Sequence, residues 1–231
     1  MRKVIVNFSG GKDSTVAILE AMKRYPKEEI VLCYQDTGAE YLETEGHVKI
    51  IAGMLDLPLV ILYPLRTFWD EAKRVGFFPT PSCRNCTTHL KVDAFKKWFN
   101  SIKYEYDEHI VVFGRRGEES LSRSKMPEWM SDPKITTNTI KPKIWNPLIH
   151  MSEQEVYERI KTEGLPLHPC YDFSPRCSCW CCIFQPWQVV RTYAEEYPEL
   201  YEHACLVEEE IKHKWKIGFG FSDLMKQGRL F

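Results

Sequence analysis

Residues 3–25 read KVIVNFSGGKDSTVAILEAMKRY, and they decide the fold of this 231-residue chain. The β-branched run at 3–9 predicts a buried strand, and the apolar residues of 13–25 recur at helical spacing until Pro26. Two glycines stand between these segments, where they let the backbone approach an anion at the N-terminus of the helix. The stretch therefore predicts a phosphate-binding loop at the carboxyl end of a strand.

The following segments continue the alternation of strands and helices. Three more strands are predicted over 28–38, 58–65 and 108–116, and three more helices over 41–57, 67–77 and 87–102. Alternation of this kind predicts right-handed crossovers between parallel strands. We therefore expect an α/β fold with a doubly wound, mostly parallel sheet that has helices on both faces.

The last part of the chain has a different character. Residues 125–147 are rich in Pro, Thr and Lys and have little periodicity, which predicts a long loop or an irregular edge. Ser152 and Glu155 form the pattern of a capping box at the start of a helix, and most of the remaining chain looks helical apart from a cysteine loop. We therefore expect a nucleotide-binding domain at 1–147 and a mainly helical annex at 148–231, packed on the first.

Composition excludes several classes of protein. Lys and Arg number 31 against 32 for Asp and Glu, so no overall basic field argues for nucleic acid, although a local basic patch stays open. The N-terminus has no signal-peptide pattern, and no run of about 18 apolar residues predicts a membrane span. We expect a cytoplasmic protein without membrane contact, in which clustered cysteines are metal ligands or redox groups rather than disulfides.

The glycine loop has a definite chemical character. Lys12 adds a positive charge, and Ser9 and Ser14 add hydroxyl groups. It is not a Walker A loop, because that pattern needs a glycine where Val6 stands and a Ser or Thr where Asp13 stands. The alternative interpretation is an ordinary glycine turn.

The motif SGGKDS at 9–14 resembles the pyrophosphate loop (PP loop) of enzymes that cut a nucleotide at its α-phosphate. The chain as a whole resembles the phosphoadenosine phosphosulfate (PAPS) reductase-like family of the PP-loop ATP pyrophosphatase superfamily. Five further motifs carry this resemblance over about residues 1–190: DTGAEYLET (36–44), CTTHLKVDAF (86–95), GRRGEESLSR (114–123), WNPLIHMSEQEVYERI (145–160) and YDFSPRCSCWCCIF (171–184). The resemblance implies an adenine nucleotide alpha hydrolase-like fold that binds ATP or a sulfonucleotide.

The resemblance also implies a set of nucleotide-binding residues. They are Ser9, Gly10, Gly11, Lys12, Asp13, Ser14, Asp36, Thr37, Gly38, Gly114, Arg116 and Glu119. The expected catalytic residues are Lys12, Asp13, Asp36, Arg116 and Arg123. They would position the nucleotide and neutralise charge during an in-line displacement at the α-phosphate, assisted by Mg²⁺.

Two of these assignments have open alternatives. Asp36 is expected to bind the nucleotide or Mg²⁺, but an aspartate before Gly38 is equally typical of a turn. Arg116 and Arg123 suit phosphate or sulfate, and Glu119 is expected to orient one arginine by an ion pair. A solvated charge cluster is the other interpretation of this segment.

The cysteines form two C-x-x-C pairs far apart in the chain. The expected metal ligands are Cys83, Cys86, Cys179 and Cys182. Four thiolates suit either Zn²⁺ or a [4Fe–4S] cluster, and the resemblance favours the cluster. Because the first pair departs from the adjacent Cys-Cys of adenylyl-sulfate reductases, Cys170 or Cys177 could replace Cys83. Buried or incidental thiols are the remaining alternative.

The C-terminal stretch 218–231, GFGFSDLMKQGRLF, lacks the cysteine with which sulfonucleotide reductases attack their substrate. We therefore expect an ATP pyrophosphatase that adenylates an acceptor for sulfur transfer to nucleic acid. Candidate partners are DNA or tRNA as the acceptor, a cysteine desulfurase or thioredoxin, and a second copy of the chain. The alternatives are a PAPS or adenylyl-sulfate reductase with an unusual cysteine, and a non-catalytic nucleotide-binding subunit of a modification complex.

Overall fold

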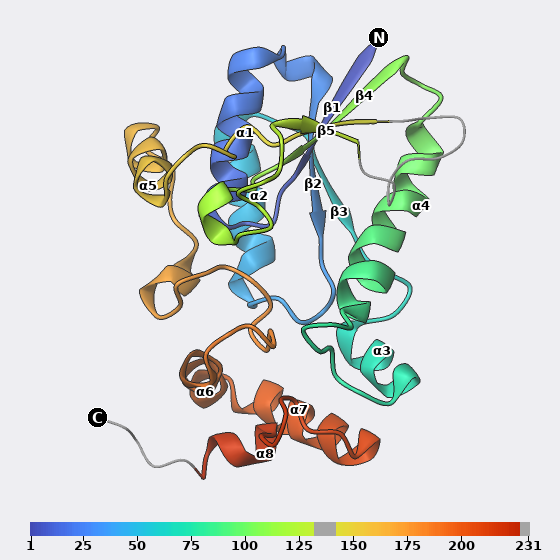
Figure 1. Cartoon of the computed structure of the whole chain (residues 1–231), viewed down its shortest axis with the longest axis vertical. Coiled ribbons are helices and arrows are strands. Elements are labelled where there is room, and N and C mark those ends of the chain that lie inside the picture. Colours follow the sequence, from blue (N-terminus) through green and yellow to red (C-terminus); the bar gives the residue numbers. More distant parts are fainter. Residues whose placement is uncertain (132–141, 227–231) are drawn as a thin grey trace.

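The computed structural model describes residues 1–131 and 142–226 and contains one sheet. Its strands are β1 (Arg2–Asn7), β2 (Ile30–Gln35), β3 (Leu59–Leu62), β4 (Glu108–Phe113), β5 (Trp129–Met130) and β6 (Lys143–Trp145). They lie in the order β3-β2-β1-β4-β6-β5, and every neighbouring pair is parallel except β5 with β6 (Figure 1). The expected α/β fold with a mostly parallel sheet is confirmed.

Helices cover both faces of the sheet. The α-helices of the described part of the chain are α1 (Lys12–Arg24), α2 (Glu43–Leu55), α3 (Phe68–Val75), α4 (Asp93–Ile102), α5 (Glu153–Thr162), α6 (Trp187–Glu196), α7 (Pro198–Ile211) and α8 (Phe221–Leu224). Helices α1, α2 and α5 contribute to the core on one face, and α4 contributes to the core on the other. Figure 1 shows α4 across the strands from α1 and α2.

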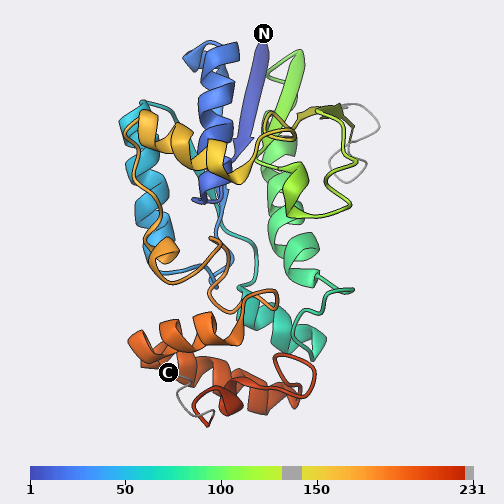
Figure 2. The ribbon, with the colours of Figure 1, turned by 60° about the vertical axis from the view of Figure 1, so that its left-hand side comes forward.

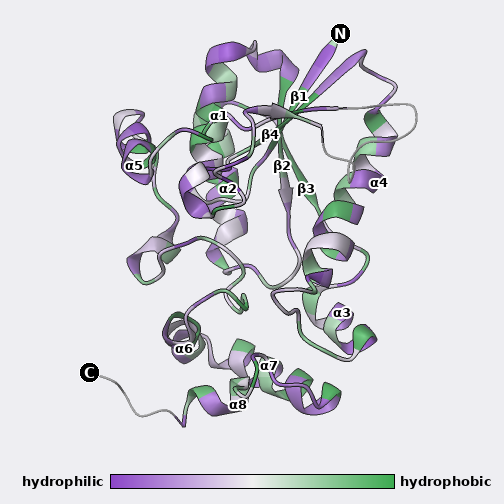
Figure 3. Cartoon of the chain, in the orientation of Figure 1, coloured by the Kyte–Doolittle hydropathy of each residue, from purple (hydrophilic) through white to green (hydrophobic). Residues whose placement is uncertain are grey.

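The central position of β1 in the sheet explains why its sequence is continuously apolar rather than alternating between apolar and polar residues. Successive side chains of a strand point to opposite faces of the sheet. Val4 and Val6 therefore pack toward α1 and α2, while Ile5 packs toward α4, and all three are fully buried. A strand buried on both faces needs a continuous apolar run, which Figure 3 shows in green on the central strands.

The C-terminal helices form a separate layer at the carboxyl ends of the strands. Helices α6, α7 and α8 lie below the sheet in Figure 2, and a second core joins them to α3. Trp69 and Phe78 from the first part of the chain share that core with Trp180, Trp215 and Phe221. Because α5 packs with α1, the boundary between 147 and 148 stays a prediction.

Two local features refine the sequence-based expectations. Of the alternatives for 125–147, the irregular edge is right where the structure describes it, because β6 and β5 form that edge of the sheet; residues 132–141 lie outside the described part. The helix expected from residue 87 begins with a π-helical turn, Cys86–Val92, before α4. Within the described ranges, no helix combines the length and apolarity that crossing a bilayer requires.

Candidate nucleotide and cysteine site

The PP loop joins β1 to α1 and is closed by its own serines. Gly10 has a φ of +79°, in the left-handed region that favours glycine. The Ser9 amide donates to the Ser14 hydroxyl oxygen at 3.2 Å, and the Ser14 hydroxyl donates to the Gly11 carbonyl at 2.8 Å. The loop thus turns the chain into α1 and presents the first amides of that helix, where an anion is stabilised.

Gly114 follows β4 and lies against the start of α1. A Cβ atom added at Gly114 would stand 2.5 Å from the Asp13 carbonyl oxygen and 2.7 Å from the Ser14 amide nitrogen. Both are backbone atoms, so this close approach of two segments requires glycine. The structure therefore places Gly114 beside the PP loop, where the missing side chain lets the end of β4 pack directly against the start of α1.

The basic groups predicted to bind phosphate are held by carboxylates in this structure. Lys12 and Arg116 are buried, with 4% and 5% of their surface exposed. The Lys12 ammonium lies 2.9 Å from the Glu153 carboxylate, and the Arg116 guanidinium lies 3.6 Å from it. Arg116 also pairs with Asp13 and, at 2.9 Å, with Glu118. The site therefore holds its cations in place by negative charges that phosphate groups could replace.

Glu153 is a site residue that sequence reasoning missed. It is the first residue of α5, behind the predicted capping box, in which the Ser152 hydroxyl accepts from the Glu155 amide at 3.2 Å. A hydrogen bond from Lys12 lowers the pKa of Glu153, and burial opposes this effect. The capping signal located the helix end, but no local pattern showed that this end faces the PP loop.

The segment after β4 adds a second charged group. Arg123 pairs with Glu119, as expected, and the Glu119 carboxylate also accepts the Arg116 amide at 2.9 Å. Burial lowers the pKa of Arg123, and the charges of Arg115 and Arg176 lower it further. Arg115, from the segment after β4, and Arg176, just before the first cysteine of 177–182, are thus close enough to Arg123 to repel it, while Asp13 partly offsets this positive charge.

The DTG segment, residues 36–40, folds into a tight turn after β2. The Asp36 carboxylate accepts the Gly38 amide at 2.7 Å, and Gly38 has a φ of +76°. Glu40 accepts hydrogen bonds from the amide and the hydroxyl of Thr37, both at 2.8 Å. Burial raises the pKa of Asp36. Asp36 therefore has the turn role, while its contact with a nucleotide or Mg²⁺ stays a prediction.

The cysteine loop, residues 177–182, runs along the DTG segment. Cys179 forms a β-bridge with Glu40, and the Trp180 amide donates to the Ala39 carbonyl at 3.0 Å. The Trp180 ring is buried in the core of the C-terminal helices. This loop therefore connects the C-terminal layer to the carboxyl end of β2.

Three of the four predicted metal ligands lie near a half-buried ion pair, Lys91 with Glu40. Burial and the Glu40 carboxylate raise the pKa of the Cys179 thiol, and Cys182 and Cys86 lie close enough to raise it further. The Lys91 ammonium, 3.1 Å from Glu40, acts in the opposite direction. Burial has the larger effect, so the Cys179 thiol keeps a raised pKa even though the Lys91 ammonium lies nearby.

Cys83 has different surroundings. It is exposed, its thiol donates to the Asn85 side-chain oxygen at 3.4 Å, and its amide donates to the Thr80 hydroxyl at 3.0 Å. These contacts lie within its own turn. Cys86, Cys179 and Cys182 are near enough to influence one another electrostatically, and a metal site shared by the four predicted ligands stays a prediction.

A second group of sulfurs lies closer to the PP loop. The ligand atoms of His168, Cys170 and Cys177 all lie within 4.8 Å of one another, and no other trio of such groups is as compact in the ranges 1–131 and 142–226. The Cys177 sulfur is 3.8 Å from the Ser9 carbonyl oxygen. Sequence reasoning named Cys170 and Cys177 only as substitutes for Cys83, and their mutual contact was not foreseen.

Tyr171 connects this second group to the PP loop. Its hydroxyl oxygen accepts the Lys12 amide at 2.9 Å, and its ring lies 5.1 Å from the Lys12 ammonium. The first amide of α1 is therefore already hydrogen-bonded. An anion that binds this amide has to displace the Tyr171 hydroxyl or share the donor with it.

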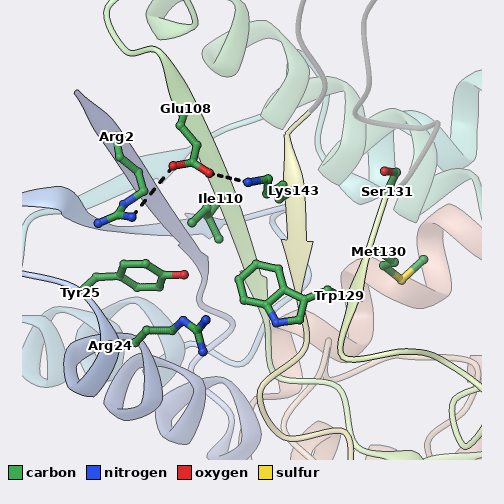
Figure 4. A pocket seen from close by; sticks show the side chains of 9 residues that line it. All are labelled: Arg2, Arg24, Tyr25, Glu108, Ile110, Trp129, Met130, Ser131 and Lys143. Carbon is green, nitrogen blue, oxygen red and sulfur yellow. Dashed lines mark hydrogen bonds and ion pairs between the residues drawn. The ribbon is translucent and has the colours of Figure 1, made fainter.

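A cavity of about 740 Å³ lies elsewhere on the molecule. Figure 4 shows Glu108 between Arg2 and Lys143, each at the start of a strand. The residues that line this cavity are Arg2, Arg24, Tyr25, Glu108, Ile110, Trp129, Met130, Ser131 and Lys143. The cavity lies near the beginning of β1, whereas the PP loop follows the end of that strand, so we assign the nucleotide site to the loop.

Comparison with known proteins gives matches in both sequence and fold. The model of the phosphoadenosine phosphosulfate reductase domain matches residues 3–183. The PAPS reductase of Candida auris has a similar fold, with a TM-score of 0.54, 16% identity, and coverage of 77% of this chain and 82% of the other. The FMN adenylyltransferase of Candida glabrata gives a TM-score of 0.51 at 14% identity, covering 74% and 52% of the two chains.

Relatives in sequence are longer than this chain. An uncharacterised protein of Methanocaldococcus jannaschii is 28% identical over 95% of this chain, which spans 44% of that relative's length. An uncharacterised 37.8 kDa protein of Escherichia phage 186 is 27% identical, with coverage of 78% of this chain and 66% of its own length. The chain therefore spans less than half of one of these relatives.

Proposed function

Because this chain belongs to the phosphoadenosine phosphosulfate reductase domain family, we propose that it cleaves ATP at the α-phosphate to adenylate an acceptor for sulfur transfer, with an iron–sulfur cluster beside the nucleotide. The observation that carries the proposal is the cysteine loop, which lies along the DTG segment and reaches the PP loop through Cys177. Nucleotide chemistry and thiol chemistry would then take place in one site.

The proposed reaction has two displacements. An oxygen of the acceptor attacks the α-phosphorus of ATP, the bond to the β-phosphate breaks, and pyrophosphate leaves. A sulfur nucleophile then attacks the adenylated carbon, and AMP leaves with the oxygen. We propose a nucleic acid as the acceptor, because the arginines near Arg123 favour a polyanion.

The chain's own residues would bind and orient the pyrophosphate group. Lys12 and Arg116 are buried and paired with Glu153, so incoming phosphates would replace a carboxylate without recruiting cations from solvent. Glu119 holds both the Arg116 amide and the Arg123 side chain. Preorganised cations of this kind stabilise charge that develops on a leaving group.

The donor set of Cys86, Cys179 and Cys182 fits an iron–sulfur cluster better than a single zinc ion. Four thiolates around zinc, with bonds of about 2.3 Å, place sulfurs about 3.8 Å apart. Where the structure describes the chain, only the group around Cys170 brings three potential ligand atoms within 4.8 Å. A cluster binds each thiolate to a different iron and suits a wider set; when bound, it would supply a place to hold sulfur.

The test is an anaerobic purification with iron, zinc and absorption measurements. We expect absorbance at about 400 nm in the unaltered protein, and loss of iron in Cys86→Ser, Cys179→Ser and Cys182→Ser. The matched control is Cys205→Ser. Cys205 lies on α7, away from the proposed cluster ligands and from Cys170 and Cys177, so this variant should keep its iron. Stoichiometric zinc in the unaltered protein would refute the cluster.

Activity is tested separately with ATP, sulfide and a tRNA or DNA pool. We expect AMP and pyrophosphate in equal amounts and loss of both products in Lys12→Ala. The second candidate is sulfonucleotide reduction, which the match to a PAPS reductase domain favours. Release of sulfite from PAPS or adenylyl sulfate with thioredoxin, independent of ATP, would select that reaction instead.

A further inference from the structure

Two thiols outside the proposed cluster lie together beside the PP loop. The sulfurs of Cys170 and Cys177 lie within 4.8 Å of each other, and neither residue forms a disulfide in this structure. Cys170 is 1% exposed, whereas Cys177 is only partly buried. Disulfide exchange needs one thiol that attacks the incoming disulfide and a second thiol nearby that releases the mixed disulfide. A partly exposed thiol next to a buried thiol provides this arrangement.

The third member of this group argues against a metal site. The Nδ1 atom of His168 accepts the Cys170 amide at 3.0 Å, and the Nε2 atom lies 3.1 Å from the Thr44 hydroxyl. A metal ion would have to break one of these hydrogen bonds. The ring instead anchors the backbone that carries Cys170, which leaves the two thiols as the reactive pair.

We propose that Cys170 and Cys177 form a redox-active dithiol that exchanges with small-molecule disulfides next to the PP loop. The Cys177 thiolate attacks one sulfur of the incoming disulfide, and the first small thiol leaves. Cys170 then attacks the Cys177 sulfur, and the second small thiol leaves. Two protein thiols and one small disulfide become one protein disulfide and two small thiols, so atoms and electrons balance.

Oxidation of the pair changes contacts of the PP loop. A disulfide has an S–S distance of about 2.05 Å, shorter than an ordinary contact between two thiols. The Cys177 sulfur now lies 3.8 Å from the Ser9 carbonyl, and a Cβ atom on Gly11 would meet the Cys177 Cβ at 3.2 Å. Tyr171 follows Cys170 directly, so closing the disulfide also strains its bond to the Lys12 amide.

The experiment equilibrates the anaerobically purified chain with mixtures of reduced and oxidised glutathione. Free thiols are then blocked at low pH and the protein is digested with trypsin. Cleavage after Arg176 separates peptide 162–176, which carries Cys170, from peptide 177–191, which carries Cys177. We expect oxidised glutathione to join these peptides, with a mass lower by two hydrogens, and the link to vanish in Cys170→Ser and Cys177→Ser. Cys205→Ser should keep it.

Hydrogen exchange gives a second measurement that requires no nucleotide. We expect amides 9–14 to exchange about fivefold faster or more in the oxidised chain, and β2 to be unchanged. The proposal is overturned if peptides 162–176 and 177–191 stay unlinked at every glutathione ratio. It is also overturned if Cys177→Ser loses iron as Cys179→Ser does, since Cys177 would then be a cluster ligand. Neither the peptide link nor hydrogen exchange depends on ATP cleavage. A negative result for the dithiol can therefore be told apart from a negative result for the proposed function.

Discussion

Replacing Gly114 by alanine should separate β4 from the start of α1. The new Cβ would stand 2.5 Å from the Asp13 carbonyl oxygen, whereas ordinary contacts begin at 3.4 Å, so the two segments must move apart by 0.9 Å (3.4 − 2.5). Every nearby atom belongs to the backbone, and no side chain can rotate away. Overpacking of this kind costs about 3 kcal/mol, and the displaced segment is the one that carries Lys12 and Asp13.

The matched control is Gly46→Ala. Gly46 lies exposed within α2, and a Cβ atom there meets nothing within 4 Å. Alanine is favoured over glycine inside a helix, so this change should stabilise the chain by about 0.5–1 kcal/mol.

Urea denaturation gives the free energy of unfolding of both variants, and calorimetry gives their affinity for ATP. We expect Gly114→Ala to lose stability and ATP binding together, while Gly46→Ala keeps both. If Gly114→Ala unfolds within about 0.5 kcal/mol of the unaltered protein and binds ATP normally, the packing argument is refuted.

Three further changes probe other parts of the molecule. Glu153→Gln removes the carboxylate that competes for Lys12 and should tighten pyrophosphate binding about two- to fivefold by calorimetry; weaker binding would show that the carboxylate itself helps to hold the ligand. Burial and His168 lower the pKa of His47 to about 4, below its value of 6.5 in the unfolded chain. The unfolded chain therefore takes up a proton at His47 before the folded chain does. The folded state keeps its full stability above pH 6.5 and loses stability as the pH falls toward 4. Melting at several pH values should show that His47→Gln removes about 2 kcal/mol of this acid sensitivity; identical pH profiles would contradict it. Glu208 is buried and accepts backbone amides near α8, so Glu208→Ala should cost about 3 kcal/mol in urea denaturation, and an unchanged midpoint would be the contrary result.

The sheet and the PP loop were predictable because their signals are local. The apolar run of β1, the glycines and the periodicity of α1 lie within residues 3–25, and each follows from backbone geometry within a few positions. β5 and β6 gave no such signal, since strands of two and three residues are too short to show a period. Their position in the sheet depends on pairing with β4, which only the folded chain reveals.

The partners of the predicted site residues were harder to predict. Glu153 and Tyr171 meet Lys12 across more than a hundred residues of chain, and no spacing rule connects positions so far apart. The C-x-x-C spacing of Cys83 and Cys86 suggested that both bind one metal. In the structure Cys86 is partly buried at the start of a π-helical turn and Cys83 is exposed in the turn before it, so a metal bound by both stays a prediction.

Burial along the cysteine loop explains why its thiols face two different groups. Trp180 and Cys181 are fully packed in the C-terminal core, and the Trp215 indole donates to the Cys181 carbonyl at 2.8 Å. These anchors hold the middle of the loop, so Cys179 and Cys182 project toward Cys86. Cys177 precedes the anchored residues and reaches the PP loop instead. The C-terminal core therefore fixes the middle of the loop, and with it the positions of the thiols that we propose for the cluster and for the redox pair.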